Sequence, residues 1–110
     1  MIFVTGPLYA GKKTWIRGRL GLTETELSAI AVWDVQELAQ TGSLEVLADQ
    51  LADWRIVIAT EIGCGVVPVD PAERERREAA GRLSCLRAER AEPVVRVCCG
   101  LPQLLKGEWP

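Results

Sequence analysis

The stretch that decides the fold is the amino-terminal run Met1-Ile2-Phe3-Val4-Thr5-Gly6-Pro7-Leu8-Tyr9-Ala10-Gly11-Lys12-Lys13-Thr14. Its opening residues form a short apolar run, which is typical of a strand buried on both faces. Residues 6–12 then fit the pattern G-x-x-x-x-G-K. In this pattern the glycines let several backbone amides turn toward one phosphate, and the lysine adds a positive charge. The run therefore predicts a buried strand, a phosphate-binding loop and a helix over 12–20.

Two features of the loop leave alternatives open. The P-loop pattern places Ser or Thr directly after the lysine, where the hydroxyl coordinates magnesium. This chain has Lys13 there and Thr14 one position later. Because one residue turns a helical side chain by about 100°, Thr14 is not an obvious substitute. Lys13 either neutralises phosphate charge itself or marks a site whose catalysis is weakened or lost. The competing interpretation of the whole loop is a tight Gly-Pro turn that binds nothing.

The candidate residues for nucleotide binding, with Tyr9 as one that could lie against the ligand, are Gly6, Pro7, Leu8, Tyr9, Ala10, Gly11, Lys12, Lys13 and Thr14.

Further apolar runs alternate with helical patterns along the rest of the chain. Runs at 29–33, 55–60 and 94–99 predict three more strands. Helices are predicted over 35–40, after an N-cap at Ser43, and from an N-cap at Asp70 to about residue 91. Residues 21–26 are expected to form a polar connection and the tail to 110 to be loosely ordered. The alternation predicts an α/β fold, a single domain over 1–110 with a parallel sheet of four to five strands flanked by helices.

Three finer expectations follow from these patterns. The last helix should turn Ala72, Ala79, Leu83 and Leu86 inward, and Glu73 should complete its capping box. Cys98 and Cys99 suit a buried strand end. The side chains expected to serve packing rather than stacking on a ligand are Trp15, Trp33 and Trp54, and those expected to be solvated or salt-bridged are Arg77 and Arg82.

Two carboxylates follow predicted strands and should reach the edge of the sheet that holds the loop, because ligands bind at the carboxyl ends of parallel strands. Asp34 is a candidate magnesium ligand, acting through water, and its alternative is a helix N-cap. Glu61 could act as a base or contact a hydroxyl, and its alternative is a solvated loop carboxylate. The predicted catalytic set is Lys12, Asp34 and Glu61. Gly63 and Gly65 indicate either a close backbone approach or a plain turn.

Composition excludes several classes of protein. The chain has 110 residues, a net charge of −2 and no histidine, which argues against nucleic-acid binding and excludes a Cys/His zinc site. No apolar run approaches the ~20 residues of a membrane span. The four cysteines include no CxxC pair, and with the first predicted strand starting at Met1 we expect no signal peptide. We therefore expect a cytoplasmic protein with free thiols.

Four segments together resemble one known family. Residues 2–6 with Gly11 and Lys12 look like its first strand and P-loop. Residues 58–68 are similar to its T-N-E-V-G-x-G-I-V-P block, 77–83 resemble its R-D-x-x-G-R-x-N block, and 94–100 fit its last strand. The family is the bifunctional adenosylcobinamide kinase/adenosylcobinamide-phosphate guanylyltransferase of cobalamin biosynthesis.

The resemblance implies a kinase that uses ATP or GTP with Mg²⁺ to phosphorylate the aminopropanol hydroxyl of adenosylcobinamide. It also implies guanylyl transfer through a histidine, and a trimer as in several members. The chain has no histidine, and the segment that carries it in the family has no counterpart here. The P-loop residues and Glu61 carry over by match, with Asp34 in the role of the acidic strand end. The function expected is kinase-like phosphoryl transfer; the alternative is a non-catalytic nucleotide- or corrinoid-binding module.

Overall fold

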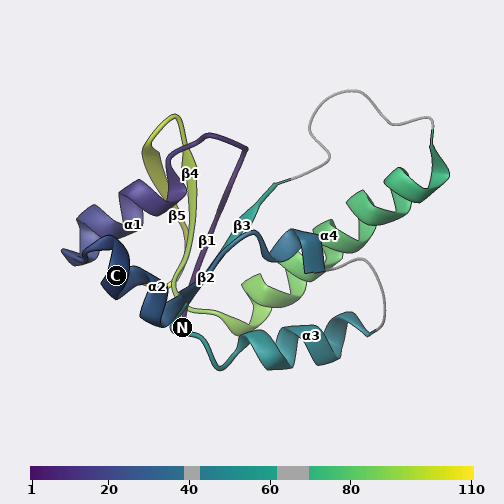
Figure 1. Cartoon of the computed structure of the whole chain (residues 1–110), viewed down its shortest axis with the longest axis horizontal. Coiled ribbons are helices and arrows are strands. Elements are labelled where there is room, and N and C mark those ends of the chain that lie inside the picture. Colours follow the sequence, from purple (N-terminus) through teal and green to yellow (C-terminus); the bar gives the residue numbers. More distant parts are fainter. Residues whose placement is uncertain (39–42, 62–69) are drawn as a thin grey trace.

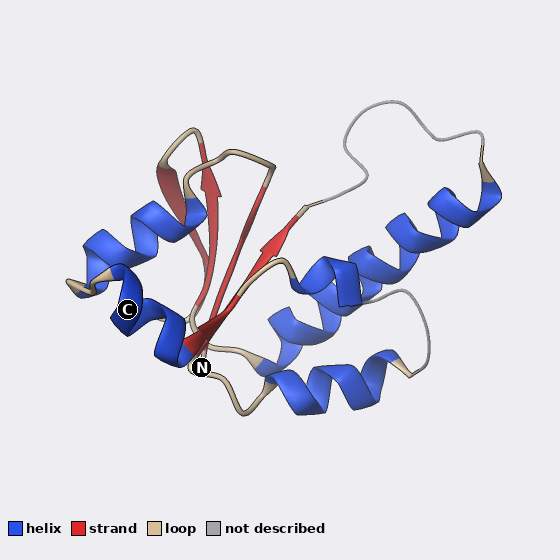
Figure 2. Cartoon of the chain, viewed as in Figure 1, coloured by secondary structure: helices blue, strands red, loops and turns tan. Residues whose placement is uncertain are grey.

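The structure is a computed structural model that describes residues 1–38, 43–61 and 70–110. Within these residues a five-stranded sheet lies between two layers of helices (Figures 1 and 2). The elements in chain order are β1 (Ile2–Gly6), α1 (Lys12–Leu20), α2 (Glu24–Ile30), β2 (Ala31–Val32), the 3₁₀ helix η1 (Val35–Leu38), α3 (Leu44–Leu51), β3 (Ile56–Thr60), α4 (Pro71–Arg90), β4 (Val94–Cys98) and β5 (Leu101–Lys106).

The sheet has the strand order β2-β3-β1-β4-β5, with β1 at its centre. Strands β1, β2, β3 and β4 run parallel to one another, and β5 runs antiparallel to β4. Gly6 lies opposite Thr60, so the carboxyl ends of β1 and β3 are level. The predicted α/β fold with a mainly parallel sheet is confirmed.

Each central strand is buried on both faces, as its apolar sequence predicts. On one face, Val4, Ile58 and Val97 form a core with Ile16 of α1 and Leu27 of α2. On the other face, Phe3, Val57 and Val94 pack with residues of α3 and α4, among them Ala48 and Leu83. Helices α1 and α2 therefore cover one side of the sheet and α3 and α4 the other (Figure 1).

The polar segment after α1 is a helix, where we expected a connection. Thr23 caps α2, and its hydroxyl accepts from the Glu26 amide at 3.1 Å while the Glu26 carboxylate accepts from the Thr23 amide at 3.0 Å. This reciprocal capping box offsets the weak apolar pattern of the helix. Because α2 extends to Ile30, the expected strand over 29–33 is reduced to Ala31–Val32.

The carboxyl-terminal tail is ordered, contrary to expectation. Cys99 and Gly100 adopt φ values of 53° and 73° and reverse the chain, so that Leu101–Lys106 pairs with β4. Five of the six β5 residues are exposed, which explains the lack of an apolar pattern in the sequence. The reversal also leaves Cys99 exposed and Cys98 only partly buried. Beyond β5, the Trp109 ring packs edge-on to Trp15 at 6.3 Å.

Helix α4 begins and ends close to the predicted positions, but its buried face differs. The Asp70 carboxylate caps it by accepting from the Ala72 amide at 3.0 Å, rather than through a capping box with Glu73. Ala72 is exposed, because the first turns of α4 extend away from the sheet (Figure 1). Ala80, Leu83 and Arg87 are buried, and Ala79 and Leu86 are partly buried.

Other predictions on or near α4 have mixed outcomes. Arg82 is exposed and pairs with Glu78 at 3.3 Å, whereas Arg77 is half-buried. The predictions for Gly63 and Gly65 lie outside the described residues. In the part of the chain that the structure describes, no helix is both long enough and apolar enough to cross a bilayer.

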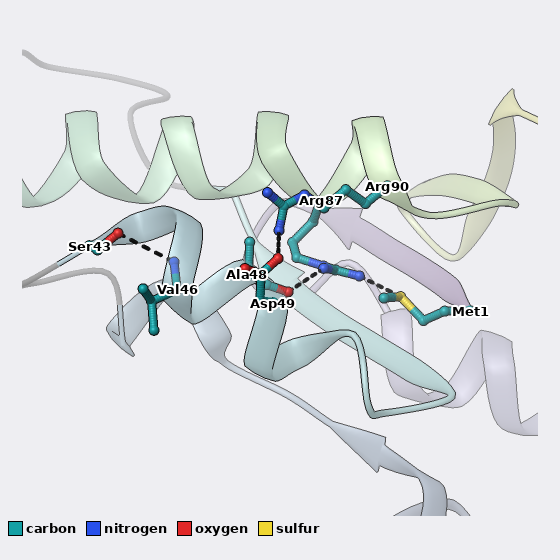
Figure 3. Close-up of polar contacts among 7 residues, drawn as sticks. All are labelled: Met1, Ser43, Val46, Ala48, Asp49, Arg87 and Arg90. Carbon is teal, nitrogen blue, oxygen red and sulfur yellow. Dashed lines mark hydrogen bonds and ion pairs between the residues drawn. The ribbon is translucent and has the colours of Figure 1, made fainter.

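Arg87 joins α4 to the other elements on its side of the sheet (Figure 3). Its side chain is fully buried, and Nη1 donates to the Ala48 carbonyl at 2.7 Å while Nη2 donates to the Met1 sulfur. Burial lowers the pKa of the Arg87 guanidinium, the neighbouring Arg90 lowers it further, and Asp49 raises it. One turn along α4, Arg90 forms an ion pair with Asp49, whose side chain is exposed.

We expect Arg87→Ala to lower the free energy of unfolding by about 2–4 kcal/mol, because it removes a buried charged hydrogen bond and leaves a cavity. Arg90→Ala serves as the matched control. It removes a solvent-exposed ion pair and should cost less than about 1 kcal/mol. Urea denaturation followed by circular dichroism measures both, and equal losses for the two variants would contradict the role assigned to Arg87.

Candidate functional site

The loop between β1 and α1 turns back over the end of the sheet. The Ala10 amide donates to the Pro7 carbonyl at 3.3 Å, while Tyr9 and Gly11 take positive φ values of 59° and 86°. Of the four amides of residues 8–11, only that of Ala10 donates a hydrogen bond to a backbone carbonyl of the described residues. Neighbouring amides of the loop therefore remain available to an external acceptor.

Helix α1 begins at Lys12 with no side-chain cap. The other described α-helices have one each, from Thr23, Ser43 and Asp70. The first amides of a helix have no partner inside it, and side-chain caps normally satisfy some of them. At α1 these amides and the positive end of the helix are left for a ligand, and an anion suits both.

Lys12 is buried, and its ammonium donates to the Pro7 carbonyl at 2.7 Å. Burial lowers the pKa of Lys12, and the carboxylates of Asp34 and Glu61 raise it. A phosphate placed at the loop would act in the same direction as the two carboxylates, because it favours the protonated amine. The geometry thus sets a desolvated positive charge directly on the loop.

A cavity of about 230 Å³ adjoins the loop. Most of the predicted binding and catalytic residues line it, and Gly6, Pro7 and Glu61 do not. Its described lining is Leu8, Tyr9, Ala10, Gly11, Lys12, Lys13, Thr14, Trp33, Asp34, Ile58 and Thr60. Lys13 and Thr14 both line the cavity, although successive residues of a helix point in directions about 100° apart. The replacement of the usual Ser or Thr by Lys13 therefore leaves both residues at the site.

The Lys13 ammonium lies 4.3 Å from the centroid of the Trp33 ring, a cation–π distance. We expected Trp33 to be a packing residue, and it also forms a wall of the cavity. Asp34, the next residue, is exposed and has a φ of 57°. This left-handed backbone is uncommon outside glycine. Asp34 thus sets a carboxylate at the cavity just after the end of β2 at Val32.

Glu61 lies at the end of β3 and is held by Arg96, a residue that the sequence patterns did not single out. Arg96 Nε donates to Glu61 Oε1 at 2.7 Å and Nη2 donates to Oε2 at 3.0 Å. Arg96 alternates along β4 with Val95 and Val97, which face α1 and α2, so this pair lies toward α4. The Glu61 amide also donates to the Gly6 carbonyl at 2.8 Å. The feature of the sequence that could have identified Arg96 is its place as an arginine inside an otherwise apolar strand.

A larger hollow of about 450 Å³ lies at the opposite edge of the sheet, lined by residues such as Met1, Leu20, Ile30 and Trp54. It lies at the amino ends of β1 and β3, where Ile2 and Ile56 begin these strands. Ligands of parallel α/β sheets bind at the carboxyl ends of the strands. We therefore assign the candidate site to the smaller cavity at the loop.

Comparison with known proteins bears on the same chain. The family described as cobinamide kinase / cobinamide phosphate guanyltransferase matches residues 27–105, which is most of the chain. The chain belongs to this family. It is also 43% identical over 70 residues to the bifunctional adenosylcobalamin biosynthesis protein CobP of Pseudomonas aeruginosa, and the alignment covers 61% of this chain and 40% of that protein. The chain thus spans well under two thirds of this curated relative.

The match to the cobinamide kinase / guanyltransferase family includes Asp34, Glu61 and Arg96 but begins after the phosphate loop. Evidence for the loop therefore comes from its own sequence pattern and geometry. Within the described residues no group of three or more acidic, histidine or cysteine side chains is placed to hold a metal ion. Asp34 is the one carboxylate in the described lining of the cavity and would be the residue that holds a magnesium ion. This fits the one or two carboxylates that Mg²⁺ usually takes beside phosphate oxygens.

Gly6 is the loop position most constrained by its neighbours. A Cβ added there would overlap the Val97 carbonyl oxygen of β4. We expect Gly6→Ala to lower the free energy of unfolding by about 2–4 kcal/mol through this backbone clash.

Gly81→Ala is the control for that substitution. A Cβ at this exposed helical position meets nothing within 4 Å, and alanine should stabilise the helix by about 1 kcal/mol. Thermal unfolding of the two variants measures both effects. A Gly6→Ala protein as stable as the wild type would show that β4 does not confine the loop.

Proposed function

We propose that this chain binds ATP or GTP through the loop over 6–14 and transfers the terminal phosphoryl group to the aminopropanol hydroxyl of adenosylcobinamide. The observation that carries the proposal is the uncapped amino end of α1 beside a buried lysine. Its support is the phosphate-loop pattern, the cavity that joins the loop to Asp34, and membership of the cobinamide kinase / guanyltransferase family.

In this proposal each residue has a separate role. Amides of the loop and of the first turn of α1 bind the phosphates, and Lys12 neutralises charge that moves onto the oxygen between the β- and γ-phosphates. Lys13 and Thr14 lie beside the same phosphates. Asp34 would hold Mg²⁺ through water, and the ion, when bound, neutralises phosphate charge.

Glu61 would orient the acceptor. Each carboxylate oxygen has lone pairs beyond the one that accepts from Arg96, so it can still accept a hydrogen bond from the hydroxyl. The acceptor oxygen forms a bond to the γ-phosphorus, the bond from that phosphorus to the bridging oxygen breaks, and the hydroxyl proton leaves to solvent or Glu61. The products are the phosphate ester and a nucleoside diphosphate.

The proposal is confined to the kinase reaction. The resemblance places guanylyl transfer on a histidine, and these 110 residues contain none. Magnesium-insensitive nucleotide binding together with no turnover would instead support a binding module. Incubation of the purified chain with adenosylcobinamide and ATP or GTP, followed by mass spectrometry, tests the kinase directly: the expected product gains one phosphoryl group, and its absence with both nucleotides contradicts the proposal.

The contribution of Lys12 can be measured by calorimetric titration of ATP and GTP. We expect Lys12→Ala to weaken nucleotide affinity at least about tenfold, because hydrogen bonds to charged groups contribute about 1.5–3 kcal/mol. Lys106→Ala is the charge-matched control. Lys106 lies on β5 and donates to carbonyls at the end of α4, at Ala88 and Glu89. Unchanged affinity in Lys12→Ala would leave the loop without a role.

The contribution of Asp34 appears in the magnesium dependence of the same titration. In the wild type we expect Mg²⁺ to strengthen nucleotide binding. Asp34→Asn should remove most of that gain and leave the metal-free affinity equal or higher, because a negative charge near the phosphates is lost. A magnesium effect of the same size in both proteins would exclude Asp34 as the residue that holds the ion.

A further inference from the structure

A second hollow, of about 130 Å³, lies between α1 and α2. Its polar lining comes from Lys13, Thr14 and Arg17 of α1 and from Glu24 and Ser28 of α2, and its apolar lining from Leu27 and Trp33. The site described above does not use Arg17, Glu24 or Ser28. Pockets for whole drug-sized ligands are about 300–1,000 Å³, so this hollow suits one chemical group of a larger molecule.

The hollow has two cationic side chains on one face of α1. Lys13 and Arg17 are four residues apart and therefore neighbours on that face. The Arg17 Nε atom is buried and has no hydrogen-bond partner among the described residues. A buried N–H without an acceptor costs about 1–3 kcal/mol, more when the group is charged. Arg17 as a whole is only partly buried and lines the hollow.

The two cavities adjoin. Lys13, Thr14 and Trp33 line both the hollow and the cavity at the phosphate loop. A molecule in the hollow would therefore lie beside a phosphate at the loop, with the Lys13 ammonium between them. Glu24 is the one carboxylate in the described lining, and with Lys13 and Arg17 it leaves a balance of one positive charge.

We propose that this hollow is an oxyanion subsite that receives the phosphate monoester of a second ligand next to the nucleotide. A guanidinium fork, an ammonium and a hydroxyl together match the oxygens of a phosphate group. The recognition of the anion follows from the hollow itself. Only the claim that a nucleotide binds beside this phosphate rests on the proposed function. In that reaction the phosphate monoester would be the phosphorylated acceptor.

Inorganic phosphate is the probe, and NMR of the Trp33 indole N–H, assigned with Trp33→Phe, is the readout. The titration uses Lys12→Ala protein, so that binding at the loop is weakened. We expect saturable phosphate binding that Arg17→Gln, made in the same protein, weakens on the order of tenfold. Glu24→Gln should tighten binding about two- to fivefold, because it removes the opposing charge.

Arg76→Gln is the control, since Arg76 is an exposed arginine on α4, on the other side of the sheet; it should leave phosphate binding unchanged. An affinity that Arg17→Gln does not alter overturns the proposal. So does equal weakening by Arg76→Gln, which would mean that phosphate responds only to overall charge.

A second titration adds phosphate to wild-type protein saturated with GTP. We expect phosphate still to bind, with the same dependence on Arg17. Displacement of phosphate by GTP would assign the hollow to the nucleotide itself and overturn the proposal. If no nucleotide binds but phosphate binds through Arg17 in the Lys12→Ala protein, the proposed function fails while the subsite stands.

Discussion

The loop after β1 is confined by backbone contacts on both of its sides. The Gly6 carbonyl accepts from the Glu61 amide at the end of β3, and the Ala10 carbonyl accepts from the Gly100 amide beyond β4, both at 2.8 Å. Gly6 itself lies so close to the Val97 carbonyl that no larger residue fits. These contacts fix where α1 begins, and the direction of its unpaired amides follows from them. An anion site built this way is preorganised, because its donors need no rearrangement when a ligand binds.

Charge is arranged around those amides by three strands. Lys12 follows β1, Asp34 follows β2 and Glu61 follows β3, while Arg96 of β4 fixes the Glu61 carboxylate from the α4 side. Desolvation lowers the pKa of the buried Lys12, and the two carboxylates oppose that lowering, which favours the charged form that binds phosphate. Lys13 resting on Trp33 adds a second ammonium at the position where P-loops have a hydroxyl. The balance of positive charge beside the loop is therefore greater than in the usual pattern.

Much of this arrangement could be predicted from sequence, and the failures have local physical reasons. Buried strands β1 and β3 and the Pro71 start of α4 carry strong signals: continuous apolar runs and a capping aspartate. Helix α2 was missed because its apolar face is short, although its Thr23–Glu26 capping box was there to be found. Strand β5 was missed because pairing with β4, not burial of its side chains, orders it.

The site shows the same division. Lys12, Lys13, Thr14 and Asp34 were predicted, because a motif and strand ends place them. Arg96 and Trp33 contribute through contacts with Glu61 and Lys13, on elements distant in sequence, and these pairings are not encoded in a local motif. The orientation of the Glu61 carboxylate likewise depends on Arg96, a partner from another strand.

The most direct test of the central claim is an NMR titration of the chain with GTP, following every backbone amide. The account predicts the largest shifts at Tyr9, Gly11, Lys12 and Lys13, because phosphate oxygens would accept from amides in this stretch. Shifts concentrated instead around Met1, Leu20 and Trp54, at the larger hollow by the amino ends of the strands, would contradict it.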